Sequence, residues 1–165
     1  ALPVSVNISP VQMRKGRLRE SVLRALNESG LAPSLLALEI TEGAVMEDVT
    51  SAARLLDDLH AIGVQIEIDD FGTGHSSLAY LKQLPIQRLK VDRSFIRDIP
   101  GDPDDTAIVE AIISLATSLK IGIIAEGVET DEQRTFLLAR GCRAMQGYRF
   151  AHPESPEAFE KRLAG

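Results

Sequence analysis

The chain has 165 residues, of which 44% are hydrophobic and 25% are charged. This composition is typical of a single globular domain with its own core, and it excludes a disordered chain. The net charge of −6 argues against a binding surface for DNA or RNA but permits a small anionic substrate held through cations. No uninterrupted apolar stretch reaches the roughly 18 residues of a membrane span, so we expect no membrane contact from this segment.

Short β-branched runs alternate with amphipathic helical stretches along the whole chain. The predicted strands are, in order, Val4–Ile8, Leu36–Ile40, Val64–Asp69, Arg88–Val91, Gly122–Glu126 and Ala144–Tyr148. Repeated β-then-α units predict a parallel sheet with right-handed crossovers. Six such units suit either an open doubly wound sheet or an incomplete (β/α)8 barrel of the TIM type, since a closed barrel has eight.

Capping signals mark several helix ends. A capping side chain precedes a proline at Ser9, Asp102 and Ser155, and Thr130 with Gln133 matches a capping box. Glycines follow the helical stretches where a left-handed cap is expected, at Gly30, Gly63, Gly122 and Gly141.

A polar or charged residue stands near the C-terminal end of every predicted strand. These residues are Asn7, Glu39, Asp69 with Asp70, Lys90, Glu126 and Gln146. Barrels and open α/β sheets place their active sites at that end of the strands. Buried carboxylates are costly unless they are paired or bind a metal, and oxygen ligands suit Mg²⁺, Mn²⁺ or Ca²⁺. Each residue alone fits a solvated strand end equally well, but the recurrence at every strand favours a metal site.

The two adjacent aspartates raise a question of geometry. Asp69 and Asp70 point to opposite faces of an ideal strand. Both reach one site only if the strand ends there, and the segment Phe71–Gly74 provides the expected turn.

Other chemical motifs are incomplete. Asp70–Gly72 is similar to a kinase motif, but the chain has neither the glycine-rich phosphate loop nor the catalytic loop of a kinase. The three histidines are too scattered along the sequence for a zinc site. Cys142 is the single cysteine, which predicts a buried thiol in a reducing cytosol.

Six segments together resemble the signatures of the EAL-domain family, in the order and spacing of that family. They are Val6–Pro10, Leu38–Glu42, Asp69–Leu78, Lys90–Phe95, Ala125–Thr130 and Gln146–Tyr148. The resemblance covers essentially the whole chain. It implies a barrel fold and hydrolysis of one phosphodiester bond of cyclic di-GMP, giving linear pGpG with two Mg²⁺ or Mn²⁺ ions.

The resemblance also implies a role for individual residues. Asn7, Glu39 and Asp69 would bind one metal ion, and Asp69, Asp70 and Glu126 would bind the second. Lys90 would hold or deprotonate the attacking water, with its pKa lowered by the cations, and Gln146 would position water or substrate. Glu42 and Glu129 would anchor a loop that couples the site to dimerisation; the loop and substrate residues are Phe71, Gly72, Thr73, Gly74 and Ser76.

The chain departs from the family in three places. The Glu-Ala-Leu triplet, whose acid binds the first metal, is absent, so residues 1–165 are expected to be a truncated EAL domain without its first strands. His75 replaces an aromatic residue. Glu67 occupies an inward position that is usually small or apolar, and we interpret it as a solvated or salt-bridged acid, with a surrogate ligand as the alternative.

Two functions follow from these observations. The intact domain is expected to be a cyclic di-GMP phosphodiesterase, whereas the 165 residues alone are expected to be an inactive cyclic di-GMP-binding or dimerisation module. We expect a homodimer in the cytoplasm with sensory or signalling domains upstream. A cytosolic segment of a larger, membrane-anchored protein is compatible with this expectation.

Overall fold

The computed structural model describes residues 2–74 and 78–164. Its six strands are β1 (Val4–Ile8), β2 (Leu36–Thr41), β3 (Gln65–Phe71), β4 (Arg88–Val91), β5 (Gly122–Ala125) and β6 (Ala144–Met145). Every pair of neighbours is parallel, and the strands lie in the order β1-β2-β3-β4-β5-β6. A doubly wound sheet reverses its order at one point. This sheet does not, so it is a curled segment of a barrel.

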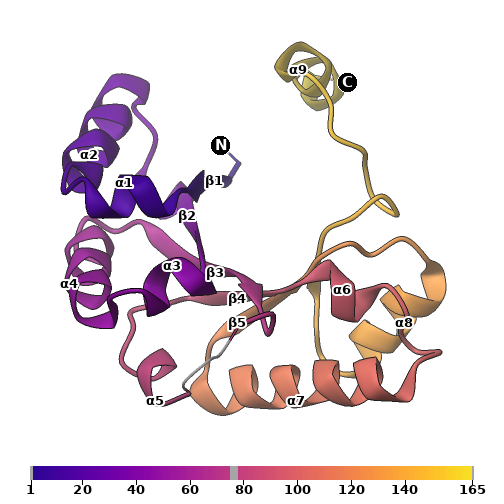
Figure 1. The fold of residues 1–165 in the computed structure, drawn as a ribbon. Helices are drawn as coiled ribbons and strands as arrows, with labels where there is room; N and C mark the ends of the chain where they lie inside the picture. The colour runs from indigo at the N-terminus through magenta and orange to yellow at the C-terminus, as the bar shows by residue number, and fades with distance from the viewer. Residues whose placement is uncertain (1, 75–77, 165) are drawn as a thin grey trace.

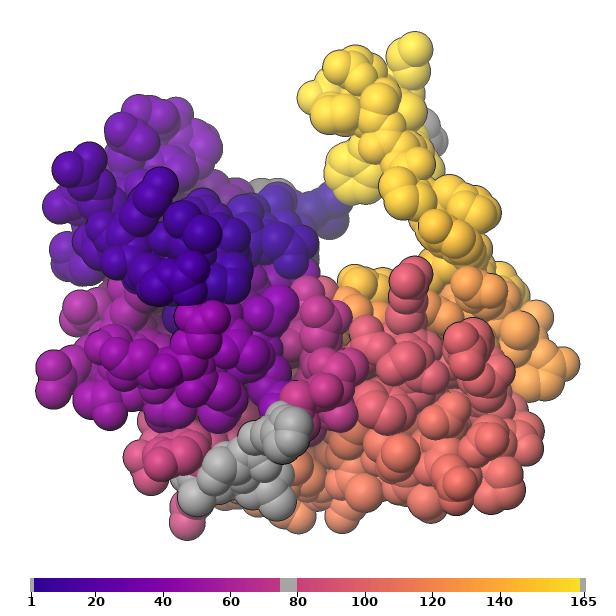
Figure 2. All heavy atoms as spheres, viewed as in Figure 1, coloured from indigo at the N-terminus to yellow at the C-terminus, as the bar shows by residue number. Residues whose placement is uncertain are grey.

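Helices fill the connections between the strands (Figure 1). They are α1 (Pro10–Arg14), α2 (Leu18–Ser29), η1 (Pro33–Leu35), α3 (Glu42–Met46), α4 (Val49–His60), α5 (Leu78–Leu81), α6 (Arg93–Ile96), α7 (Pro103–Leu119), α8 (Asp131–Ala139) and α9 (Pro156–Ala164). Helix α9 extends away from the body, and the space-filling view shows an opening below it, between the N-terminal part and the C-terminal segment that leads to α9 (Figure 2).

The predicted caps form, with one exception. Ser9 and Thr130 complete capping boxes, and the Asp102 carboxylate accepts hydrogen bonds from two backbone N–H groups of α7. Gly122 is not the cap of α7. Lys120 takes the left-handed conformation there with φ 59°, and Gly122 begins β5.

The core lies between the sheet and the helices. Alternate strand residues point into it and are fully buried: Leu38, Ile40, Ile66, Ile68, Leu89 and Val91. Cys142 is also buried, as predicted, and this burial raises the pKa of its thiol to about 11. The other face of the strands looks into the barrel and carries the polar residues.

Candidate metal and active site

Lys90 lies at the centre of the polar cluster. Its Nζ atom is 2.5 Å from Glu39 Oε2, 3.0 Å from Asp69 Oδ1 and 2.6 Å from Glu126 Oε1. Its side chain is only 3% exposed. A buried ammonium group is tolerated only with close anionic partners. The strand-end residues of β2 to β5 therefore meet at one rim, as the sequence predicts.

The protonation of Lys90 reflects the same contacts. Burial acts to lower its pKa, but hydrogen bonds to Glu126, Glu39 and Asp69 outweigh burial and raise the pKa above its usual value. The lowering expected from nearby cations therefore has to overcome these three carboxylates. Lys90 is a charged hydrogen-bond donor in this arrangement.

A group of three acids can offer oxygen atoms to one ion. One carboxylate oxygen each from Asp69, Asp70 and Glu126 lies within 4.8 Å of the other two. These are the residues that the resemblance assigns to the second metal ion. Asp69 also contacts Lys90, which links this group to Glu39.

The way in which Asp70 reaches the group differs from the expectation. Strand β3 does not end at Asp69 but continues to Phe71. The register with β4 shifts between Ile68 and Phe71, and Asp70 has a positive φ of 53°. Such bulges redirect side chains near active sites, and a positive φ at a residue without glycine's freedom is costly. A local bulge within the strand thus turns both aspartates to one side.

Asp70 and Glu126 lie in an environment that disfavours their charged forms. Burial raises the pKa of Asp70, and the nearby carboxylates of Asp69 and Asp92 raise it further. Burial also raises the pKa of Glu126, against the opposing effect of Lys90. Divalent cations would relieve this repulsion, and the all-oxygen donor set suits hard ions. The residues present therefore fit a divalent metal site.

Asn7 and Glu39 stand side by side on β1 and β2. They are direct partners in the strand register, so their side chains point to the same face of the sheet. Glu39 is buried and bonded to Lys90, whereas Asn7 is exposed. Their pairing is compatible with a first metal ion held by Asn7, Glu39 and Asp69.

Gln146 follows the short strand β6 and touches Glu126. Its Nε2 atom donates a 2.5 Å hydrogen bond to Glu126 Oε1. The backbone fixes this position, because Val128 N–H donates to Gln146 O. Strand β6 ends at Met145 rather than at the predicted Tyr148, so Gln146 lies just beyond the strand.

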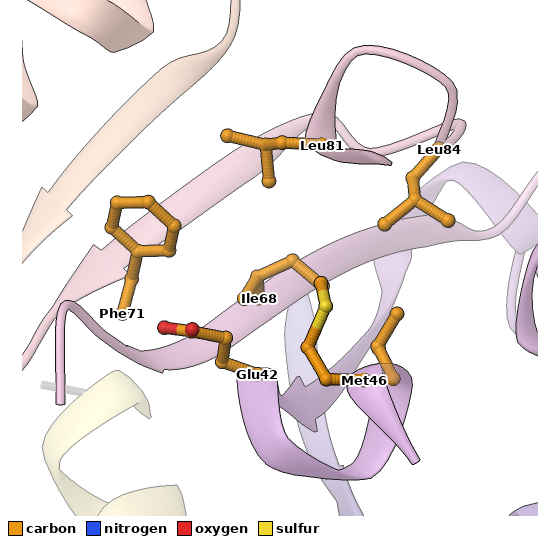
Figure 3. Close-up of a pocket in the computed structure, with 7 residues that line it drawn as sticks. Glu42, Met46, Ile68, Phe71, Leu81 and Leu84 are labelled. Atoms are coloured by element: carbon orange, nitrogen blue, oxygen red, sulfur yellow. The ribbon is translucent and has the colours of Figure 1, made fainter. Parts of the chain in front are cut away.

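Glu42 supports the loop after β3. Its buried carboxylate accepts a 3.1 Å hydrogen bond from Gly72 N–H and points toward Phe71 (Figure 3). A Cβ atom at Gly74 would lie 2.9 Å from Glu42 Oε1, which explains a glycine there. The adjoining apolar cavity of about 10 Å³ is too small for a substrate.

The remaining loop predictions have different outcomes. Thr73 closes the turn through a 2.9 Å hydrogen bond from Oγ1 to Asp70 O. Glu129 is exposed, and in the described part of the chain its backbone N–H donates to Gln133 while its side chain makes no hydrogen bond. Ser76 and His75 lie outside the described residues. Loop anchoring by Glu129 stays a prediction.

Glu67 lies beneath the site, two residues before Asp69 on the same face of β3. It is 1% exposed, and its Oε1 atom is 2.5 Å from Arg88 Nη1. The acid is therefore salt-bridged, as interpreted from the sequence, but it is not solvated. It is not part of the acid group of Asp69.

Asp92 is a residue that the sequence interpretation missed. Burial acts to raise its pKa, but hydrogen bonds from Ser94 outweigh it and hold the pKa below the usual value. Asp92 also contributes to the raised pKa of Asp70. The available signal was its spacing: Asp92 comes two residues after Lys90, directly after the end of β4, where the other site residues of the strands also lie.

A curled parallel sheet gathers carboxylates, an amide and a lysine at its strand ends, which is the arrangement of a candidate divalent-metal site in a barrel protein. The family model described as "EAL domain" matches residues 1–153. The chain belongs to the EAL domain family.

Two curated relatives from Pseudomonas aeruginosa show how far the similarity extends. The bifunctional diguanylate cyclase/cyclic di-GMP phosphodiesterase MucR is 47% identical over 98% of this chain and 24% of its own length. The cyclic di-GMP phosphodiesterase NbdA is 46% identical over 98% of this chain and 21% of its own length. The chain therefore spans about a quarter of the length of these relatives.

Solved structures share the fold. The MucR phosphodiesterase in complex with c-di-GMP superposes with a TM-score of 0.92 at 46% identity, over 95% of this chain and 64% of that one. Klebsiella pneumoniae BlrP1, in a manganese and cyclic di-GMP complex, gives 0.79 at 33% identity, over 92% of this chain and 39% of that one. Both confirm the barrel fold predicted from the sequence.

Proposed function

We propose that the protein hydrolyses cyclic di-GMP to linear pGpG with two divalent metal ions, Mg²⁺ or Mn²⁺. The observation that carries this proposal is the convergence of Asp69, Asp70 and Glu126 within 4.8 Å, next to Lys90. Relatives that act on or bind cyclic di-GMP, including a manganese complex, support the substrate and the class of metal.

We assign two sets of residues to the two metal ions. Asn7, Glu39 and Asp69 would hold one ion, and Asp69, Asp70 and Glu126 the other. Bound divalent ions lower the pKa of a water molecule and neutralise charge on a phosphate. The water oxygen forms a bond to phosphorus, the bond from phosphorus to the 3′ oxygen breaks, and that oxygen takes up a proton.

Lys90 and Gln146 position the reacting groups. The Nζ atom of Lys90 has three N–H donors and lies against three carboxylates. It would donate a hydrogen bond to the attacking water once a bound metal ion takes its place at one of these carboxylates. Gln146 fixes the orientation of Glu126 through its amide. Such fixed donors need little reorganisation when charge develops.

The test is incubation of the intact protein with cyclic di-GMP and Mg²⁺ or Mn²⁺, followed by chromatography. We expect linear pGpG, and no product when EDTA removes the metal. Binding of cyclic di-GMP without any product would contradict the proposal and favour a binding module. Product formed by residues 1–165 alone would contradict the prediction that this segment is inactive by itself.

Assembly and location stay predictions of the family resemblance. We propose a homodimer, which analytical ultracentrifugation can test. Among residues 2–74 and 78–164, no helix combines the length and the apolar character needed to cross a membrane.

A further inference from the structure

Gln133 is a buried residue of α8 whose side-chain amide is hydrogen-bonded on both sides. The residue is 3% exposed. Its Oε1 atom accepts hydrogen bonds from Glu129 N–H at 2.7 Å and from Thr130 N–H at 2.9 Å. Its Nε2 atom donates to Ile96 O at 3.0 Å and to Arg97 O at 2.9 Å. The amide therefore uses both lone pairs of its oxygen and both of its N–H groups.

Helix capping accounts for only part of this arrangement. The capping box of α8 uses the hydrogen bond from the backbone of Thr130, the N-cap residue. The two hydrogen bonds to the carbonyl groups of Ile96 and Arg97 instead join residues that are 37 and 36 positions apart in the sequence. These long-range bonds show that Gln133 connects α8 to a second part of the fold.

The four hydrogen bonds join the two segments that follow β4 and β5. The two carbonyl groups lie at the C-terminal end of α6, which follows β4. The two N–H groups lie at the end of the loop that follows β5 and begins with Glu126. Glu126 N–H donates to Val91 O at 3.2 Å, directly beyond the last register pair of the two strands. Past this point, Gln133 connects the two segments.

The loop after β5 also packs closely on α6. Gly127 has a φ of 69°, and a Cβ atom there would lie 2.6 Å from Arg93 Cβ. This distance is well below the roughly 3.5–4.0 Å of a favourable contact between carbon atoms, so a side chain does not fit. Glycine gives the backbone more conformational freedom than any other residue. The hydrogen bonds of Gln133 to Glu129 and Thr130 restrict that freedom.

The position of this loop matters for Glu126. Its Oε1 atom is 2.6 Å from Lys90 Nζ, and its carboxylate belongs to the acid group of Asp69. Gln146 orients that carboxylate directly. The backbone that carries the carboxylate is held by the bond to β4 on one side and by the bonds of Gln133 on the other. Lys90 and Glu126 thus come from the two strands whose following segments Gln133 joins.

We propose that Gln133 is a positioning residue, which holds Glu126 in the geometry of the metal site by joining the loop after β5 to α6. This inference rests on the metal site of the proposed function. Hydrogen-bonded supports of metal ligands contribute roughly 10- to 100-fold to metal affinity. Gln133 acts through the backbone rather than on the carboxylate itself, so we expect an effect at the lower end of this range.

The test compares Gln133→Met and Gln133→Glu with the wild type in the intact protein. Methionine keeps the length of the side chain but removes all four hydrogen bonds, whereas glutamate keeps the acceptor for the loop and removes both donors to α6. The Mn²⁺ affinity, measured by titration calorimetry without substrate, should fall about tenfold in both variants. The added negative charge of Gln133→Glu would by itself strengthen cation binding, so it cannot cause this loss.

A second readout needs neither metal nor turnover. Hydrogen exchange of the Glu129 and Thr130 amides, followed by NMR in the metal-free protein, should become faster in Gln133→Met. It should stay slow in Gln133→Glu, because the carboxylate still accepts from both N–H groups. Fast exchange in Gln133→Glu, or unchanged exchange in Gln133→Met, would contradict the assigned hydrogen bonds.

Leu137→Ala is the matched control for a loss of stability alone. Leu137 lies on the same helix, is 1% exposed and belongs to the apolar core. Its truncation should lower the free energy of unfolding without weakening the Mn²⁺ affinity of the folded protein. All affinities are measured at a temperature at which circular dichroism shows each variant to be folded.

The outcomes separate this inference from the proposed function. If the wild type binds Mn²⁺ but forms no pGpG, the proposed function fails, while the Mn²⁺ affinities of the variants still decide the role of Gln133. Unchanged Mn²⁺ affinity in Gln133→Glu overturns that role, even if Gln133→Met does not fold. An equal loss in Leu137→Ala also overturns it, and a wild type that binds no Mn²⁺ overturns both proposals.

Discussion

The two faces of the same strands differ in polarity. Toward the helices, strands β2 and β3 present Leu38, Ile40, Ile66 and Ile68, which are at most 2% exposed. Toward the barrel interior the alternate residues of those strands include the acids Glu39, Glu67 and Asp69. One face is dry and apolar, while the other concentrates buried charge.

We expect the helix-facing side of the strands to determine stability and the inner side to determine turnover. Burial of apolar surface on the helix side contributes roughly 25 cal/mol per Å². Buried charges on the inner side are costly, and Lys90 only offsets part of that cost for Glu39, Asp69 and Glu126. Substitutions on the two faces should therefore affect different measurements.

The largest effect is expected for Asp69→Asn. Asp69 is assigned to both proposed metal ions, so its loss should weaken the binding of both. The asparagine keeps an oxygen for the hydrogen bond from Asp70 N–H, and the fold should persist. Metal-dependent turnover should fall to the detection limit; a fall of less than about tenfold, or about 1.4 kcal/mol, would contradict the bridging role. The exposed Asp58→Asn on α4 is the control and should retain full activity.

On the opposite face, Ile66→Ala should act on stability. Ile66 is fully buried, so its truncation should cost about 2–5 kcal/mol in the free energy of unfolding, measured by urea denaturation. Ile108→Ala on α7 removes the same atoms from a side chain that is 38% exposed and should cost much less. Equal losses in the two variants would mean that the helix-facing side of β3 is not the core.

The ion pair of Glu67 and Arg88 tests the comparison of the two faces further. Glu67 is a buried charge on the inner face that has no assigned role in turnover. Arg88→Met should lower the free energy of unfolding by about 1–3 kcal/mol, since Glu67 is then left buried and unpaired. This loss of unfolding free energy is smaller than for a fully buried ion pair, because the Arg88 side chain is 44% exposed. The double variant Glu67→Gln with Arg88→Met should recover part of the loss. A neutral single variant would show that Glu67 is not held by this ion pair.

A smaller effect is expected for Glu42→Gln, which removes the charge but keeps the shape of the side chain. The carboxylate holds Gly72 N–H, so the loop after β3 should loosen and turnover should fall by about tenfold, as for the loss of one charged hydrogen bond. The Mn²⁺ affinity should change little, because Glu42 is not in the acid group. Unchanged turnover together with unchanged loop protection in hydrogen exchange argues against anchoring.

Much of the fold was predictable because strand periodicity and caps are local signals. The strands Val4–Ile8 and Arg88–Val91 have the predicted bounds, and the capping residues Ser9 and Thr130 act as expected. The order of the strands is not a local property. Strand periodicity alone left the barrel and the doubly wound sheet open; the family resemblance predicted the barrel, and the structure confirms it.

The site was predictable where the period of two holds and not where the backbone departs from it. Glu39 and Lys90 lie on the inner face as alternation requires. Asp70 reaches the site through a bulge and a positive φ that no residue pattern announces. Asp92 was missed because its role as the cap of α6 hides it among ordinary helix starts.

The most direct test of the central claim is a crystal of the protein soaked with Mn²⁺ and measured at the manganese absorption edge. We expect anomalous density between the carboxylates of Asp69, Asp70 and Glu126, and its loss in Asp69→Asn. Density at some other place on the molecule, or none at a saturating concentration of Mn²⁺, would contradict it.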